Sequence, residues 1–180
     1  AAGFGRRFGG NKLQAEFDGG ATLIQCALSA IPHDKLAQVV VVTQYPQVAE
    51  LARKYGFTAL PNPHPEVGQS ESIRIGLQAL QDCDAVLFQV ADQPKLQKET
   101  VAELIDFAAA HPDRIVGLGH NGRRGNPCIF PARFYPELLA LTGDHGGRSV
   151  ILAHEEELLL MDVPSDQLID IDTPEQLEKL

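Results

Sequence analysis

Short apolar segments alternate with helical patterns along most of this chain. QVVVVT (residues 38–43) and DAVLFQV (residues 84–90) are rich in β-branched or aromatic residues and almost continuously apolar, as expected of strands covered on both faces. Between and after them, PQVAELARKYG, SESIRIGLQAL and ETVAELIDFAAA have helical spacing of apolar residues. This βαβ order predicts an α/β fold, a three-layer α/β/α sandwich with a mainly parallel central sheet.

The rest of the chain continues the alternation. IVGLGH, PCIF and ELLLMDV are further strand candidates, and TLIQCALSAI, PARFYPELLAL and GGRSVILAH are helix candidates. Near the end, Thr173, Pro174 and Gln176 form the pattern of a helix start with a capping box. In sheets of this type ligands bind at the carboxyl ends of the strands. The loops that follow strands are therefore where a site is expected.

Composition restricts the class of protein. The chain has 180 residues, 44% of them hydrophobic, and a net charge of −9, which predicts a single domain over residues 1–180. Cys26, Cys83 and Cys128 have no metal-binding spacing, so we expect a reducing cytoplasm. We expect no membrane segment and, because the chain is acidic, no nucleic-acid partner. An anionic ligand would need a local cationic site.

The opening AAGFGRRFGGNKL supplies such cations, and no acidic residue precedes Glu16. Its glycines match neither the dinucleotide fingerprint nor the P-loop fully. Glycines do let backbone N–H groups approach a phosphate, and Arg7 and Lys12 could neutralise a polyphosphate. A flexible terminus with solvated cations explains the stretch equally well.

Two further stretches could carry chemistry. In VADQP, Asp92 follows the most apolar strand and could hold Mg²⁺ beside a triphosphate, or it could simply begin a turn before Pro94. In NPHPEVGQSESIRIGL, Ser70 is expected to cap the helix, while Asn62 and Ser72 could face a base or ribose.

Taken together and in order, these stretches resemble one family. AAGFGRRFGGNKL is similar to AAGxSxRMGxxK of the molybdenum cofactor cytidylyltransferases, which are MobA-like nucleotidyltransferases with the nucleotide-diphospho-sugar transferase fold. NP with GQSESIRIGL resembles NPxxxxGxxxSxxxGL, VADQP resembles GDMP, GRRGNPCIF resembles GHPxLF, GDHGGR resembles GDxGAR, and DIDTPEQL resembles DIDTPEDL. The likeness covers essentially the whole chain and implies a Rossmann-like central sheet.

The resemblance implies a role for each matching residue. Arg7 and Lys12 would hold the triphosphate, Asp92 would bind Mg²⁺, and Asp172 would be a second acidic group near the metal. Asn126 stands where the family has the His of GHP, which affects nucleotide or pterin selectivity. The residues implied in nucleotide binding are Ala2, Gly3, Gly5, Gly9, Gly10, Lys12, Asn62, Gly68 and Ser72.

The activity implied is transfer of CMP from CTP to a molybdopterin-type cofactor, with release of pyrophosphate and with a molybdenum hydroxylase as a possible client. Two alternatives stay open: a guanylyl or sugar-phosphate nucleotidyltransferase of the same fold, and a non-catalytic cofactor-binding accessory protein. Because the family has an apolar run directly before AAG, we also expect a strand to precede Ala1.

Overall fold

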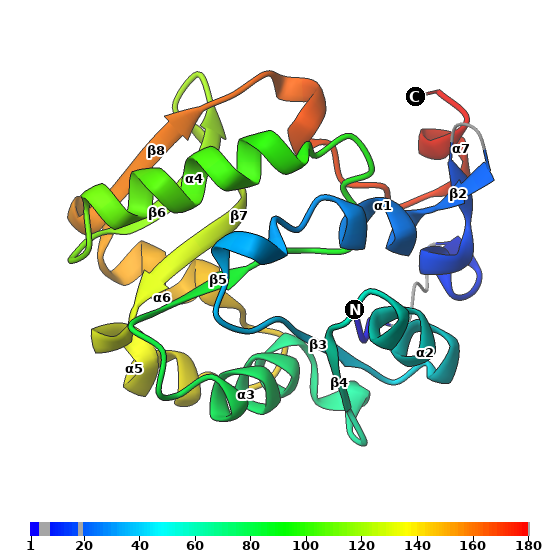
Figure 1. Cartoon of the computed structure of the whole chain (residues 1–180), viewed down its shortest axis with the longest axis horizontal. Helices are drawn as coiled ribbons and strands as arrows, with labels where there is room; N and C mark the ends of the chain where they lie inside the picture. Colours follow the sequence, from blue (N-terminus) through cyan, green and yellow to red (C-terminus); the bar gives the residue numbers. More distant parts are fainter. Residues whose placement is uncertain (4–7, 18–19, 180) are drawn as a thin grey trace.

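The structure is a computed structural model that describes residues 1–3, 8–17 and 20–179. Figure 1 shows how the helices and strands are arranged. In chain order the main elements are β1 (Glu16–Phe17), β2 (Ala21–Thr22), α1 (Leu23–Ser29), β3 (Val40–Thr43), α2 (Pro46–Lys54), β4 (Thr58–Pro61), α3 (Gln69–Ala79), β5 (Ala85–Phe88), α4 (Lys98–Ala110), β6 (Ile115–His120), β7 (Arg123–Pro131), α5 (Tyr135–Leu139), α6 (Gly147–Ala153), β8 (Leu158–Asp162) and α7 (Pro174–Leu177). The α/β class expected from the sequence is confirmed.

The largest sheet in the described residues has the strand order β5-β7-β6-β8, and three of its four strands run in the same direction, with β7 running against them. β6 and β8 are parallel, whereas β7 is antiparallel to both β5 and β6. Asn121 and Gly122 join β6 to β7, with φ values of 51° and 75°. Positive φ at both positions is what a tight hairpin turn needs, and Asn-Gly is the dipeptide that most often supplies it. The reversal of β7 therefore has a local cause.

The four-stranded sheet lies between two apolar layers, as the sandwich expectation requires. Ile115 of β6 and Phe130 of β7 pack in one cluster with residues of α3, α5 and α6. Their sequence neighbours Val116 and Ile129 pack in another cluster with Val101 and Leu104 of α4. Successive residues of a strand point to opposite faces, so these continuous apolar strands bury both faces. Helices cover the sheet on its two sides (Figure 1).

A third apolar cluster holds the first part of the chain together. Parallel strands β3 and β4 form their own two-stranded sheet, and Val41 packs with Ile24 of α1 and with Val48 and Ala52 of α2. Among the described residues β3 and β5 share no ladder. Residues of both strands line a cleft of about 2070 Å³, which continues past the carboxyl end of β5 to Asp92.

Two further observations concern the described residues. The three cysteines are free thiols, with Cys128 buried in the core. None of the helices in the described ranges has the length and apolar character needed to cross a membrane.

Candidate functional site

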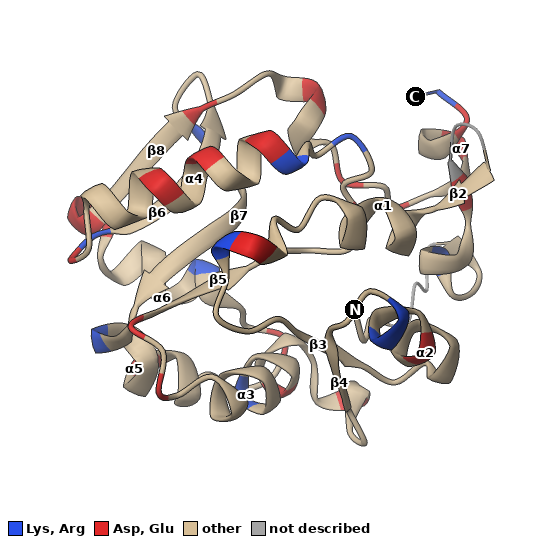
Figure 2. Ribbon diagram, viewed as in Figure 1, with Lys and Arg blue, Asp and Glu red and all other residues tan. Residues whose placement is uncertain are grey.

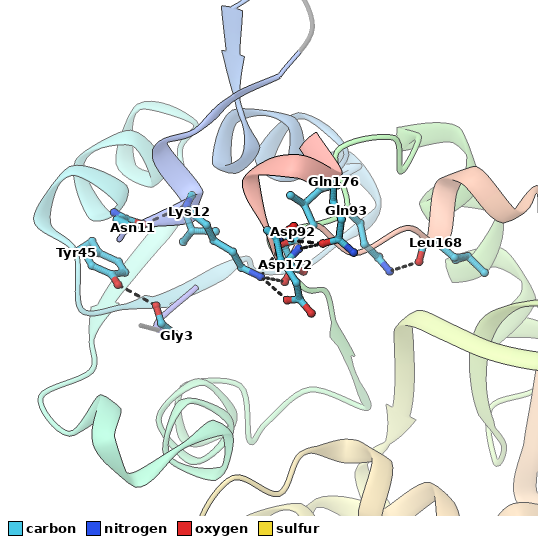
Figure 3. Close-up of polar contacts among 12 residues, drawn as sticks. Gly3, Asn11, Lys12, Tyr45, Asp92, Gln93, Leu168, Asp172 and Gln176 are labelled. Atoms are coloured by element: carbon cyan, nitrogen blue, oxygen red, sulfur yellow. Dashed lines mark hydrogen bonds and ion pairs between the residues drawn. The ribbon is translucent and has the colours of Figure 1, made fainter. Parts of the chain in front are cut away.

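The site is centred on Asp92, in the loop that follows β5. Oδ2 of Asp92 accepts a hydrogen bond of 2.6 Å from Nζ of Lys12, and its backbone oxygen accepts one of 2.9 Å from the N–H of Ile171 (Figure 3). Oδ1 of Asp92 is buried and has no hydrogen-bond partner in the described part of the chain. One oxygen of this carboxylate is therefore left for a ligand, as buried acceptors are rarely unpaired.

Asp172 reaches the same place from the other end of the chain. Its Oδ1 lies 3.2 Å from Nζ of Lys12, and the same ammonium donates to the carbonyl of Ile171 at 2.9 Å. The predicted capping box is present at the start of α7, where Oε1 of Gln176 accepts hydrogen bonds from the N–H groups of Asp172 and Thr173 at 2.7 and 2.9 Å. The cap thus fixes the backbone that carries the Asp172 carboxylate.

Lys12 is positioned by a short 3-10 helix over Lys12–Gln14. Oδ1 of Asn11 accepts the Leu13 N–H at 3.2 Å, and the Leu13 side chain is buried. Burial alone would lower the pKa of Lys12, but the hydrogen bonds and charges of Asp92 and Asp172 outweigh it and raise that pKa above its ordinary value. The lysine is therefore a fixed cation between two carboxylates.

The start of the chain lies against the carboxyl end of β3. The carbonyl of Ala2 accepts a hydrogen bond of 2.7 Å from Gln44, and that of Gly3 accepts one of 2.9 Å from the Tyr45 hydroxyl. Ala2 and Gly3 line the cleft together with Lys12 and Asp92. Protein donors therefore hold both residues in place at the border of the cleft.

The other residues of the opening segment that were expected to bind nucleotide do not line the cleft or are not described by the structure. Gly9 and Gly10 are exposed, Gly9 with φ of 78°, and neither lines the cleft. Gly5 and Arg7, expected to contact the triphosphate, lie outside the described residues.

Asn62 and Ser72 are brought together, but only one of them faces the cleft. Ser72 lines it, and Nδ2 of Asn62 donates to Oγ of Ser72 at 3.1 Å. Asn62 is 4% exposed, and its Oδ1 accepts the N–H of His64 at 2.9 Å. The structure therefore places Asn62 behind Ser72, where it orients the hydroxyl.

Gly68 precedes α3 at a close contact between segments. It has φ of 104°, and a Cβ there would lie 2.7 Å from the carbonyl oxygen of Gly143 and 2.8 Å from Cα of Asp144. The expectation that Ser70 caps α3 is wrong, because its hydroxyl donates to the Gly143 carbonyl at 2.7 Å. Oδ1 of Asp144 instead accepts the Gln69 N–H at 3.3 Å. A residue far along the chain caps this helix.

Sequence reasoning missed two residues beside Asp92. Asp170 lines the cleft, and burial, together with the charges of Asp92 and Asp172, raises its pKa although a hydrogen bond with Gln93 opposes this. Gln93 is 2% exposed. The alternation Asp170-Ile171-Asp172, with Ile171 fully buried, is the signal that was available, since residues two apart lie on one side of an extended segment.

Three arginines and an asparagine from later elements also line the cleft. Arg123 and Arg124 of β7, Asn126, and Arg148 of α6 all border it. Acidic residues recur along α4 (Figure 2). They also line the cleft, among them Asp82, Asp84 and Asp144, so an anionic ligand would be held by individual arginines rather than by a uniformly basic surface.

The carboxylates fit a divalent cation only in part. The described ranges contain no group of three or more His, Cys, Asp or Glu side chains able to hold a metal ion. Mg²⁺ commonly takes one or two carboxylates and completes its coordination with substrate phosphates and water. Asp92, with its unpaired buried oxygen, and Asp172 suit that mode of binding.

Solved structures share this fold. A nucleotidyl transferase from Methanothermobacter thermautotroptrophicus (Mth528) matches with a TM-score of 0.81 and 20% identity, over 99% of this chain and 92% of that one. Rv0371C from Mycobacterium tuberculosis H37Rv, in a complex with manganese, matches with 0.72 and 19%, over 99% and 93%. Molybdopterin-guanine dinucleotide biosynthesis protein A from Archaeoglobus fulgidus matches with 0.69 and 19%, over 99% and 92%.

Among curated proteins, no sequence matches this chain significantly. A family model described as MobA-like NTP transferase domain does match it, over residues 1–158. That span is most of the chain, and it includes the glycine-rich opening, Lys12 and Asp92. The resemblance read from the motifs is thereby confirmed, and the chain belongs to the MobA-like NTP transferase family.

Proposed function

We propose that this nucleotidyltransferase transfers CMP from CTP to the terminal phosphate of a molybdopterin-type cofactor, with Mg²⁺. An oxygen of the acceptor phosphate attacks the α-phosphorus, the bond from that phosphorus to the β-phosphate bridge breaks, and pyrophosphate leaves. The observation that carries the proposal is the meeting of Lys12, Asp92 and Asp172 at one end of the cleft, beside Ala2 and Gly3.

Asp92 and Asp172 would hold the metal ion, whose charge would neutralise the phosphates and the leaving pyrophosphate. The fit rests on the unpaired buried Oδ1 of Asp92 and on the half-exposed carboxylate of Asp172. The structure of Rv0371C with manganese, on the same fold, supports a divalent cation in this family. Reactions of this kind need little covalent help from the protein, so positioning and charge carry most of the catalysis.

The nucleotide would lie between the opening segment and the start of α3. The N–H groups near Ala2 and Gly3 would face the phosphates, and Arg7 would join them from its place in the family motif. Ser72, oriented by Asn62, would contact the ribose or base above Gly68. Lys12 would meet the triphosphate once phosphate oxygens are present.

The acceptor would occupy the part of the cleft lined by Arg124, Asn126 and Arg148. A phosphate-bearing acceptor suits the two arginines. Molybdopterin as the acceptor rests on the motifs, and the fold shared with molybdopterin-guanine dinucleotide biosynthesis protein A supports it. Because that neighbour is named for a guanine dinucleotide, guanylyl transfer is the second candidate function. A molybdenum hydroxylase as client of the product stays a proposal from the motifs alone.

The test is a panel of the four NTPs with Mg²⁺ and molybdopterin, scored by pyrophosphate release and by the mass of the product. We expect CTP to give a pterin cytosine dinucleotide, and Asp92→Asn to give none. A guanine dinucleotide would replace the cytidylyl proposal with the guanylyl one. Turnover only with sugar phosphates would replace the acceptor. No product with any pair would favour an accessory protein that binds cofactor without catalysis.

A further inference from the structure

The ammonium of Lys12 occupies the space between the two carboxylates that would hold the metal. Its Nζ lies 2.6 Å from Oδ2 of Asp92 and 3.2 Å from Oδ1 of Asp172, and its third hydrogen bond goes to the carbonyl of Ile171 at 2.9 Å. All three donors of an ammonium are thereby used. Figure 3 shows the lysine pointing at both acids.

This position differs from the one expected of a lysine that binds phosphate. Its hydrogen bonds end on carboxylates and on a carbonyl, and its side chain is 18% exposed. A divalent cation bound to Asp92 and Asp172 would lie within a few ångströms of this ammonium, and like charges at that distance repel strongly where water is scarce. A metal ion that used Oδ2 of Asp92 and Oδ1 of Asp172 would therefore have to take the place of the ammonium.

We propose that Lys12 is a resident counter-ion of the metal site: it neutralises Asp92 and Asp172 when no metal is bound, and a divalent cation has to displace it. The lysine side chain is a flexible four-carbon stem that ends in a compact charge. Its ammonium can therefore move to another anion while the buried side chain of Leu13 keeps the backbone in place. The next step rests on the proposed function: the displaced ammonium binds the triphosphate. Metal loading and nucleotide loading are then coupled through one side chain.

Displacement predicts an effect opposite to that of an ordinary catalytic lysine. Removing Lys12 should strengthen the binding of a divalent cation when nucleotide is absent, because the competitor is gone while both carboxylates remain. A lysine that only contacts phosphate would leave metal binding in the absence of nucleotide unchanged. A lysine that only supports the fold would weaken it, because the carboxylates would lose their arrangement.

The experiment measures Mn²⁺ binding without nucleotide, from the electron paramagnetic resonance signal of free Mn²⁺. Wild type is compared with Lys12→Met and with Lys35→Met as the matched control, since Lys35 forms a 2.5 Å ion pair with Asp106, a carboxylate that is not one of the proposed metal ligands. We expect Mn²⁺ to bind Lys12→Met at least tenfold more tightly than wild type, and Lys35→Met to bind like wild type. The double variant Lys12→Met/Asp92→Asn should lose the gain.

A thermal melt of each variant checks that it is folded, and Lys12→Gln replaces Lys12→Met should the latter not fold. Equal or weaker Mn²⁺ binding by the folded variant would overturn the inference, as would an equal gain in Lys35→Met. The two proposals fail separately. Tighter Mn²⁺ binding in Lys12→Met with no turnover by wild type on any NTP would sink the proposed function alone, and turnover without the Mn²⁺ effect would sink the counter-ion alone.

Discussion

Lys12 and Asp92 lie 80 positions apart in the chain, and their charged atoms are 2.6 Å apart. The contact joins the glycine-rich opening to the loop after β5. Ile171 adds the third segment, since its N–H donates to the carbonyl of Asp92 and its own carbonyl accepts from Lys12. Backbone and side-chain hydrogen bonds thus hold the same three segments together. A substitution of Lys12 or Asp92 removes side-chain bonds only, and the backbone bond between Ile171 and Asp92 remains.

Replacing Asp92 by Asn should separate chemistry from folding. The amide keeps the shape and can still accept a hydrogen bond from Lys12, so the free energy of unfolding should change by about 1 kcal/mol. Metal-dependent turnover should fall by two orders of magnitude or more, on the scale of losing one preorganised charge-stabilising group. Pyrophosphate release and urea melts measure the two quantities. Asp34→Asn, at an exposed carboxylate, is the control. Near-normal turnover in Asp92→Asn would mean that Asp92 only begins a turn.

Gln176 should act on the proposed metal site through Asp172. Its Oε1 accepts the N–H groups of Asp172 and Thr173, so Gln176→Ala should cost about 1 kcal/mol of stability, as lost caps do. It should also weaken Mn²⁺ binding severalfold, whereas Gln176→Glu retains an acceptor oxygen and should restore most of the affinity. Unchanged Mn²⁺ affinity in a destabilised Gln176→Ala would limit the cap to stability.

Gly68 should tolerate no side chain. An added Cβ meets the Gly143 carbonyl at 2.7 Å, and φ is 104°. With ψ of −161° this backbone conformation is essentially restricted to glycine, and the strain of about 1–3 kcal/mol adds to an overpacking cost of about 1–3 kcal/mol, so Gly68→Ala should lose about 2–6 kcal/mol. Gly122, with φ of 75° and nothing within 4 Å of its Cβ, is the matched control and should lose only about 1 kcal/mol. Equal losses in the two urea melts would show that the contact with Gly143 relaxes freely.

Tyr135 should make stability fall at alkaline pH. Burial, followed by the nearby charges of Cys83 and Asp84, raises its pKa from 10.0 to about 12, and its hydroxyl donates to the Cys83 carbonyl at 3.0 Å. The unfolded tyrosine ionises first, so the hydroxyl stabilises the fold fully below pH 10 and loses this effect as the pH rises to about 12. Tyr135→Phe should be less stable than wild type by about 1 kcal/mol at pH 7, and the difference should shrink above pH 10. A difference independent of pH would contradict the shifted pKa.

Periodicity predicted the alternation of helices and strands because it reflects burial, which is repeated along each element. The apolar runs at β3 and β5 and the helical spacing of α2, α3 and α4 all correspond to elements of the structure. The reversal of β7 was not predicted, although Asn121-Gly122 is a hairpin signal, because the surrounding βαβ order favoured parallel pairing. A two-residue turn decided the direction of a whole strand.

Site residues were harder to place than elements, because their contacts join distant segments. The motifs identified Lys12, Asp92 and Asp172 as residues of one site, and the structure puts them in contact. Nothing in the sequence shows that Lys12 is bound to the acids, that Asn62 lies behind Ser72 or that Asp144 caps α3. Each depends on which side chain reaches a partner across the fold, and local patterns carry no such information.

The separation of Asp92 and Asp172 in the sequence also determines when the site can form during synthesis. Eighty residues separate Asp92 from Asp172, and at about 5–20 residues per second a ribosome needs about 4–16 s to make them. During that time a nascent chain already contains Lys12 and Asp92 but lacks the second carboxylate and the backbone of Ile171. The carboxylate pair forms only when the last segment docks. Binding of the proposed metal ion by both carboxylates would therefore have to wait until Asp172 has been made and has docked beside Asp92.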